Sequence, residues 1–208
     1  MSTIIYLIRH GKTDKTKLVE ASTELIGHKE IDLDESFIPK IKELSKKLEL
    51  YKIQNVYSSN YIRTKRTASI LSNNKEIKID DRLGERKGGN PTMDITPEEY
   101  YKMQFDDPDF KFPEGESVNE IIVRMYSALK DILEENRNGQ AIVVSHGAAI
   151  TFLLRKWCDI QIIDVSKKIR RFKFKGKVIH EGVVSFIQCF KLTFNEAGDL
   201  DEIEVQGR

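Results

Sequence analysis

Short apolar runs separated by longer polar segments define the pattern of this chain. The runs over 3–8 and 140–145 are rich in β-branched residues and too short for helices, which predicts two buried strands. Shorter runs over 53–59 and 77–80 predict two further strands. The first two runs each stop abruptly at a histidine that is followed by glycine.

Between these runs, apolar residues recur at the spacing that is typical of amphipathic helices. Ser36 is expected to cap the first helix, and Ser117-x-x-Glu120 forms a capping box at the start of the longest one. The predicted helices cover residues 36–51, 60–71, 97–105, 117–136 and 148–158. Strands that alternate with helices predict an α/β fold with a mostly parallel central sheet and helices on both faces.

After residue 164 the pattern changes to that of strands. We expect strands over 169–175 and 183–194, a turn at 195–199 and an edge strand at 203–205. A strand that comes this late, without a crossover helix before it, predicts one antiparallel edge on the sheet.

Residues 84–116 interrupt the pattern and contain four of the five prolines. Thr96 and Pro97 begin a short helix within this segment, which is otherwise irregular. Long irregular insertions in compact domains are usually lids or binding loops. We therefore expect a single domain over 1–208 with a lid-like insertion over the carboxyl ends of its strands. The five aromatic residues of the insertion either line the site or form a small core of their own: Tyr100, Tyr101, Phe105, Phe110 and Phe112.

Composition narrows the possible classes of function. The 34 lysines and arginines nearly balance the 33 aspartates and glutamates, so charge gives no support for nucleic-acid or membrane-surface binding. No apolar run approaches the length of a membrane span, and no signal peptide is visible. Cys158 and Cys189 lie far apart, so we expect no disulfide framework, no zinc site and a cytoplasmic location.

A local basic run stands out at 167–177. It is interpreted either as a hairpin or edge strand protected from aggregation by its charges, or as an electropositive rim that steers anionic substrates. The interleaved Phe172 and Phe174 would suit nucleic acid, but we do not expect that partner.

The candidate chemistry lies at the strand ends, where ligands bind in open α/β sheets. Arg9 and His10 end the first strand, His146 follows another, and Ser58-Ser59 ends a third with Arg63 one helical turn later. A cation and an imidazole at the end of a buried strand cost stability unless they have a role there. Arginine binds phosphate or carboxylate through a fork of donors, whereas histidine serves as nucleophile, base or metal ligand. Together these residues favour a dianionic phosphate as the guest.

The same residues lie in blocks that resemble, in content and order, those of the histidine phosphatase superfamily, the phosphoglycerate mutase-like family. The resemblance spans residues 4 to 157, and its blocks lie at 9–13 (Arg-His-Gly-x-Thr), 57–68, 83–89, 113–117 and 144–147 (Val-Ser-His-Gly).

The resemblance implies a role for each matching position. His10 would attack phosphorus and form a phosphohistidine, while Arg9, Arg63 and His146 would bind the phosphoryl oxygens. Glu85 would protonate the leaving group and then activate water. Attack requires a neutral His10 whose other nitrogen donates to a fixed acceptor, and a backbone carbonyl is expected. Because arginine and histidine supply the charge, we expect neither a metal nor a cofactor.

Some assignments leave alternatives open. The alternative for Arg63 is an ordinary surface arginine. The alternative for His146 is a hydrogen-bonded histidine of the core. Thr13 either binds phosphate or caps a turn, and Gly147 either contacts phosphate or only permits a turn. His28 and His180 are expected at the surface. The carboxylates that compete with Glu85 for the acid role are Asp80, Asp81, Glu114 and Glu116.

Three functions are consistent with these residues. The first is a metal-independent phosphatase for a small phosphomonoester, which the length of 208 residues favours because mutases of this type tend to be longer. The second is a phosphoglycerate mutase-type phosphotransferase, and the third is a catalytically silent binding protein. The third is weakened because every residue of the implied machinery is present.

Overall fold

A six-stranded mixed sheet forms the centre of the computed structural model, which describes residues 2–14, 29–48 and 53–206. Four neighbouring strands run parallel, and two antiparallel strands complete one side of the sheet. In spatial order the strands are β3 (Ile77–Ile79), β2 (Ile53–Ser58), β4 (Gln140–Ser145), β1 (Thr3–Arg9), β8 (Cys189–Phe194) and β9 (Leu200–Gln206). The α/β class is therefore confirmed, with two antiparallel strands, β8 and β9, of which β9 forms the edge.

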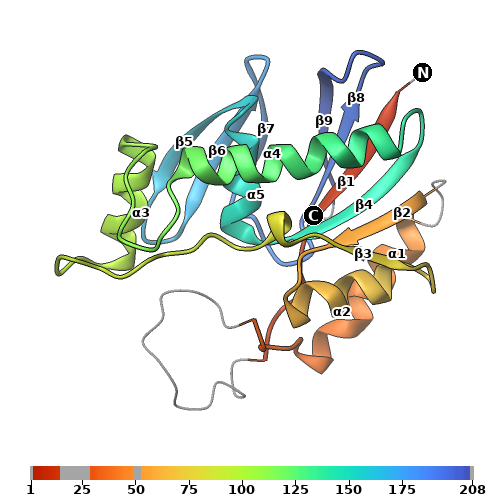
Figure 1. The fold of residues 1–208 in the computed structure, drawn as a ribbon, viewed down its shortest axis with the longest axis horizontal. Helices are drawn as coiled ribbons and strands as arrows, with labels where there is room; N and C mark the ends of the chain where they lie inside the picture. Colours follow the sequence, from red (N-terminus) through yellow and green to blue (C-terminus); the bar gives the residue numbers. More distant parts are fainter. Residues whose placement is uncertain (1, 15–28, 49–52, 207–208) are drawn as a thin grey trace.

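Helices cover both faces of this sheet (Figure 1). The alternating side chains of β1 separate two apolar clusters: Ile5 and Leu7 lie in one, and Tyr6 and Ile8 lie in the other. The first cluster is closed by α4 (Val118–Glu135) and α5 (Gly147–Leu154), and the second by α1 (Ile38–Leu48) and α2 (Ile62–Leu71). This two-sided burial explains why the parallel strands are apolar throughout rather than alternating.

A separate three-stranded antiparallel sheet was not expected from the sequence. It consists of β5 (Cys158–Asp164), β6 (Ile169–Phe174) and β7 (Lys177–Gly182). The predicted strand 183–194 is wrong in its first half, because residues 183–188 form a loop between β7 and β8. Gly182 and Ile187 both adopt positive φ angles, of 140° and 55°, which interrupt an extended chain.

The basic run 167–177 contains β6 and the start of β7, which pair as an antiparallel hairpin. Phe172 and Phe174 point into the apolar core and are not available for base stacking. The expectation that His180 is a surface residue is wrong. It is 4% exposed on β7 and packs against Phe172 and Phe190, with ring centroids 5.3 and 5.9 Å away. His28 lies outside the described residues.

The insertion contains one helix, α3 (Pro97–Asp106), which begins with the predicted Thr96 cap and Pro97. Tyr100, Phe110 and Phe112 contact one another and form the insertion's own core. Tyr101 and Phe105 pack instead on Phe152 of α5. The longest helix, α4, begins at the predicted Ser117–Glu120 capping box. The cap predicted at Ser36 is wrong, because Asp34 caps a short 3-10 helix, Glu35–Phe37, that precedes α1.

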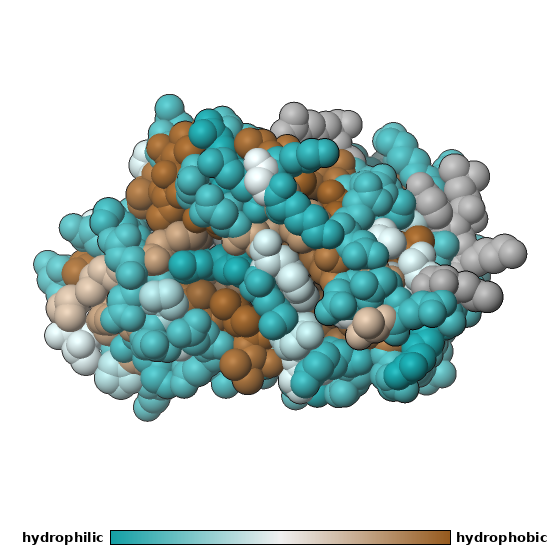
Figure 2. Space-filling model, turned by 90° about the horizontal axis from the view of Figure 1, so that it is seen from above, coloured by the Kyte–Doolittle hydropathy of each residue, from teal (hydrophilic) through white to brown (hydrophobic). Residues whose placement is uncertain are grey.

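The surface in Figure 2 is mostly hydrophilic, and polar side chains divide its apolar areas. Across the described segments, no helix combines the length and apolar character needed to cross a bilayer. Cys158 and Cys189 are both buried free thiols.

Candidate active site

Three parallel strands end at the same level and bring their following residues together. Arg9 of β1 pairs with Ser145 of β4, and Ser58 of β2 pairs with Val144 of the same strand. His10, Ser59 and His146 each come directly after one of these strands. The rings of His10 and His146 consequently lie 5.2 Å apart at the carboxyl edge of the sheet.

His10 is held in one tautomer by two contacts. Its Nδ1 lies 2.7 Å from the carbonyl oxygen of Gly11, which can only accept, so Nδ1 carries the proton. The Nε of Arg63 donates to His10 Nε2 over 3.2 Å. The lone pair of Nε2 therefore faces the guanidinium, and the expected anchoring of the other nitrogen on a backbone carbonyl is confirmed.

The electrostatic surroundings keep this imidazole neutral. His10 is almost completely buried, and burial is the main reason why its pKa lies well below the ordinary value of 6.5. The positive charges of Arg63 and Arg9 lower the pKa further. His10 therefore keeps its Nε2 lone pair at neutral pH, which is the state in which an imidazole acts as a nucleophile.

His146 ends a chain of hydrogen bonds whose direction is fixed at both ends. Arg63 NH2 can only donate, so the contact of 3.2 Å makes His146 Nδ1 an acceptor and places the proton on Nε2. Nε2 then donates to Ser59 Oγ over 2.8 Å, and Ser59 contacts Thr64 Oγ1, which donates to the carbonyl oxygen of Tyr61. Burial, followed by the charge of nearby groups, lowers the pKa of His146 well below its ordinary value.

Arg9 lies beside the histidines in a partly buried position. Its NH1 donates to the carbonyl oxygen of Val184 over 2.6 Å, and its guanidinium lies 4.2 Å from the ring centroid of Phe186. Its Nε is buried and has no hydrogen-bond partner among the described residues. Gly147, the first residue of α5, packs against it, because a Cβ there would stand 3.2 Å from Arg9 Nε. The glycine thus lets the helix start approach the guanidinium closely.

Glu85 lies at the same edge and caps α5. Its Oε1 accepts from the backbone N–H of Ala149 over 3.0 Å and from that of Arg86 over 2.9 Å. This position at the positive end of a helix is favourable for a carboxylate. Most competing carboxylates are engaged elsewhere: Asp80 binds Arg82, Glu114 accepts from Asn90, and Glu116 binds Arg124.

The remaining predicted positions of the first motif have structural contacts. Thr13 forms an antiparallel bridge with Leu33, and among the described residues no hydrogen bond joins its hydroxyl to the site. The N–H of Gly11 donates to Thr67 Oγ1 over 3.0 Å, which ties the loop after β1 to α2. A Cβ on Gly11 would stand 2.7 Å from Ile41 Cδ1, so this glycine also permits the contact with α1.

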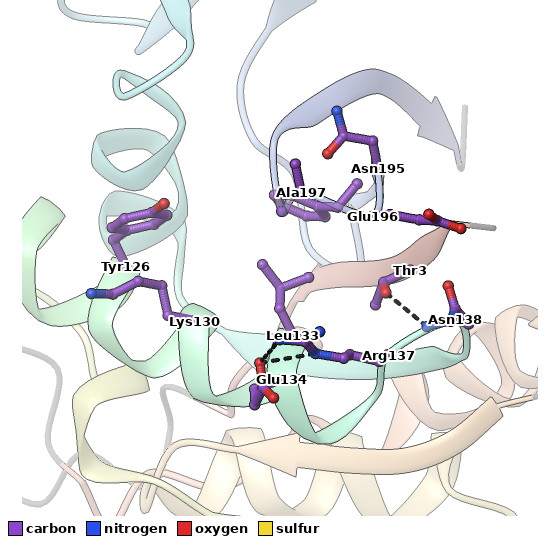
Figure 3. A pocket seen from close by; sticks show the side chains of 12 residues that line it. Thr3, Tyr126, Lys130, Leu133, Glu134, Arg137, Asn138, Asn195, Glu196 and Ala197 are labelled. Atoms are coloured by element: carbon purple, nitrogen blue, oxygen red, sulfur yellow. Dashed lines mark hydrogen bonds and ion pairs between the residues drawn. The ribbon is translucent and has the colours of Figure 1, made fainter.

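A cavity of about 200 Å³ opens beside Arg9 and Glu85. Its wall is completed by the insertion, through Arg86 and Tyr101, and by the loop after β7. A second cavity, of about 560 Å³, lies at the opposite end of the sheet where β1 begins (Figure 3). Its lining includes Thr3 and the Glu134–Arg137 pair but none of the predicted site residues.

Sequence reasoning did not identify the contacts that position Arg9. Val184 and Phe186 lie in the loop 183–188, which the alternating apolar pattern had assigned to a strand. Tyr61, whose ring packs edge-on against His146 at 4.6 Å, was also missed. Gly182, directly before the loop, was the one local signal for a break in the strand.

Comparison with known proteins agrees with this arrangement. Residues 5–172 match the model of the histidine phosphatase superfamily, branch 1. A probable phosphoglycerate mutase from Yersinia pestis is 31% identical over 159 residues, which cover 72% of each chain.

Two solved structures have a similar fold. A phosphoserine phosphatase mutant from Entamoeba histolytica, in complex with phosphoserine, has a TM-score of 0.67 and 19% identity, with 97% of this chain and 96% of that chain covered. A phosphoglycerate mutase from Bacillus anthracis has a TM-score of 0.67 and 20% identity, with coverage of 99% and 92%. The chain belongs to the histidine phosphatase superfamily, a family of phosphatases and mutases.

Proposed function

We propose that this protein is a phosphatase that hydrolyses a small phosphomonoester through a phosphohistidine on His10. The observation that carries the proposal is the fixed tautomer of His10, with Nδ1 donating to Gly11 and Nε2 facing Arg63. A neutral imidazole beside the buried guanidinium of Arg63 and the partly buried one of Arg9 combines a nucleophile with an anion-binding site.

In the first step, Nε2 of His10 attacks phosphorus, and the bond from phosphorus to the ester oxygen breaks. Arg9 and Arg63 bind the phosphoryl oxygens, with Gly147 allowing close approach of the α5 N-terminus. His146 donates to a phosphoryl oxygen from Nδ1 once the bound dianion favours protonation of its ring. Glu85 in its protonated form gives its proton to the departing alkoxide. Phosphoryl transfer depends mainly on such positioning and charge stabilisation, which this cluster supplies.

In the second step, the Glu85 carboxylate takes a proton from water as the water oxygen attacks phosphorus. The bond from phosphorus to Nε2 breaks, inorganic phosphate leaves, and Glu85 is protonated again. Glu85 supports hydrolysis because it is only partly buried and lines an open cavity, so water reaches its carboxylate. Thr13 is a weaker candidate for phosphate binding, since its backbone pairs with Leu33.

A mutase is the second candidate, and the similarity to the Yersinia protein named a probable phosphoglycerate mutase favours it. It would use the same phosphohistidine but return the phosphoryl group to a second hydroxyl of the substrate. Water must then be kept from the intermediate, so the accessible carboxylate of Glu85 favours hydrolysis.

Release of inorganic phosphate from p-nitrophenyl phosphate in the presence of a chelator tests the proposal. We expect activity in the wild type and its loss in His10→Ala. Formation of an isomer from 3-phosphoglycerate without phosphate release would establish the mutase instead. If neither reaction occurs with any phosphomonoester, the protein is a silent binder on this fold.

A further inference from the structure

A second group of cations lines the cavity beside Arg9. Arg170 of β6, Lys168 before it and Arg86 of the insertion all contribute to its wall, whereas Glu85 is the single carboxylate residue of the lining. None of these three cations forms an ion pair with a carboxylate in the described segments of the chain. The cavity therefore has more positive charge than one phosphoryl group at Arg9 requires.

Arg170 is the most buried of the three, with 6% of its surface exposed. Its NH1 donates to the carbonyl oxygen of Lys168 over 3.2 Å, and its guanidinium lies 4.4 Å from the ring centroid of Tyr101. Its Nε, like the Nε of Arg9, is buried and has no hydrogen-bond partner among the described residues. Buried polar atoms are normally hydrogen-bonded, so this Nε gives the Arg170 guanidinium a donor that no residue of the described chain uses.

Arg171, the next residue of β6, forms an ordinary surface ion pair instead. Arg171 points to the other side of β6, as strand alternation requires, and its Nε pairs with Glu181 Oε2 at 2.5 Å. One arginine of this strand thus has a carboxylate partner on the surface, while the other is directed into the cavity.

We propose that Arg170, assisted by Lys168 and Arg86, binds a second anionic group of the substrate, a carboxylate or a second phosphate. The inference rests on the proposed function, because it places the reacting phosphoryl group at Arg9 and His10. The cavity of about 200 Å³ has room for a small anionic group beside the phosphoryl group. Arg170 then discriminates between phosphomonoesters with one and with two anionic groups.

Equilibrium binding of matched ligand pairs to the full-length His10→Ala protein tests the inference. Glycerol 3-phosphate and 3-phosphoglycerate differ by a carboxylate, and the mono- and bisphosphate of propane-1,3-diol differ by a phosphate. We expect the ligand with the second anion to bind about tenfold to a hundredfold more tightly in at least one pair. The pair that shows the difference identifies the group as carboxylate or phosphate.

In the His10→Ala protein, the further substitution Arg170→Gln should abolish the affinity difference between the two ligands of the pair. It should leave the affinity for the ligand with one anionic group nearly unchanged. Adding Arg171→Gln, the matched control on the same strand, should preserve the difference. Because both affinities are measured on one preparation, their ratio is independent of the fraction that is folded. Equal or undetectable binding of both ligands in each pair overturns the inference, as does a difference that survives Arg170→Gln. Failure of the proposed phosphatase is seen separately, as absence of turnover by the wild type.

Discussion

The Nε of Arg63 donates to Nε2 of His10 over 3.2 Å, so a phosphate-binding cation holds the lone pair of the proposed nucleophile. The charge of Arg63 also contributes, after burial, to the low pKa of His10. Arg63 therefore helps to keep His10 neutral, and it is also placed to bind the phosphoryl group that His10 attacks.

Arg63→Gln should lower kcat/KM for p-nitrophenyl phosphate by roughly a thousandfold, since charge-assisted hydrogen bonds are lost in the transition state. It should also raise the pKa of His10, so that the acidic limb of the kcat/KM profile moves to higher pH. Profiles of both proteins between about pH 4 and pH 8 measure this shift. Arg66→Gln, on the same helix but paired with Asp32 at the surface, is the control and should change neither quantity. An unmoved acidic limb in Arg63→Gln would contradict the assigned role.

Ser59 positions His146, whereas its neighbour Ser58 does not. Both side chains are fully buried, but Ser58 Oγ donates to a backbone carbonyl and Ser59 Oγ contacts His146 Nε2. We expect Ser59→Ala and Ser58→Ala each to lower the free energy of unfolding by about 1 kcal/mol. Only Ser59→Ala should reduce kcat, by about tenfold, because it releases the His146 tautomer. Urea unfolding measures the loss of stability, and steady-state kinetics measures the loss of kcat. Equal losses of kcat in both variants would contradict the positioning of His146 by Ser59.

Glu85→Gln keeps an oxygen for the N–H of Ala149 but cannot transfer a proton. With alkyl phosphates, whose leaving alkoxide needs protonation, kcat should fall by roughly a hundredfold to ten thousandfold. With p-nitrophenyl phosphate, whose leaving group departs unprotonated, the fall in the first step should be much smaller. Single-turnover rates of both substrates, with thermal unfolding as a check on stability, measure the contrast. A uniform fall for both substrates would assign the acid to another group.

Much of this site was predictable because it follows strand ends. The apolar runs before His10 and His146 fix where two strands stop, and parallel pairing brings those ends to one edge. These local signals, combined with one topological rule, predict the positions of Arg9, His10 and His146 at that edge. The choice of Arg63 over a surface arginine came from the family resemblance, and the structure places Arg63 beside both histidines.

The missed parts depend on tertiary contacts that leave no periodic signal. The strand β5, Cys158–Asp164, contains Ile160 and Ile162 in a pattern too short to separate from the end of the preceding helix. Phe186 occupies an alternating apolar stretch, yet it leaves the strand pattern to pack against Arg9. No periodic signal in the sequence around His180 indicates its burial between two aromatic rings.

The two buried histidines of the candidate site should make folding stability depend on pH. Burial lowers the folded-state pKa of His146 well below 6.5, whereas the unfolded chain protonates near that value. Protons therefore favour the unfolded state, so stability is constant above about pH 6.5 and falls as the pH decreases below it. The contribution of His146 is about 1.4 kcal/mol at pH 5.5.

Urea unfolding of the wild type and of His146→Gln at pH 8 and about pH 5.5 measures this contribution. The variant should lose about 1.4 kcal/mol less than the wild type between the two conditions. The carboxylates that both proteins share cancel in this comparison. An identical loss in both proteins would mean that His146 titrates normally in the folded state.

The central claim is that the phosphoryl group passes through His10. The most direct measurement is a rapid quench of the wild-type protein during turnover of p-nitrophenyl phosphate, followed by mass spectrometry of its peptides under alkaline conditions that preserve phosphohistidine. The account predicts one phosphoryl group on the peptide that contains His10, formed at least as fast as the steady-state rate and absent from His10→Ala. Turnover without that adduct, an adduct on another residue, or unchanged turnover in His10→Ala would contradict it.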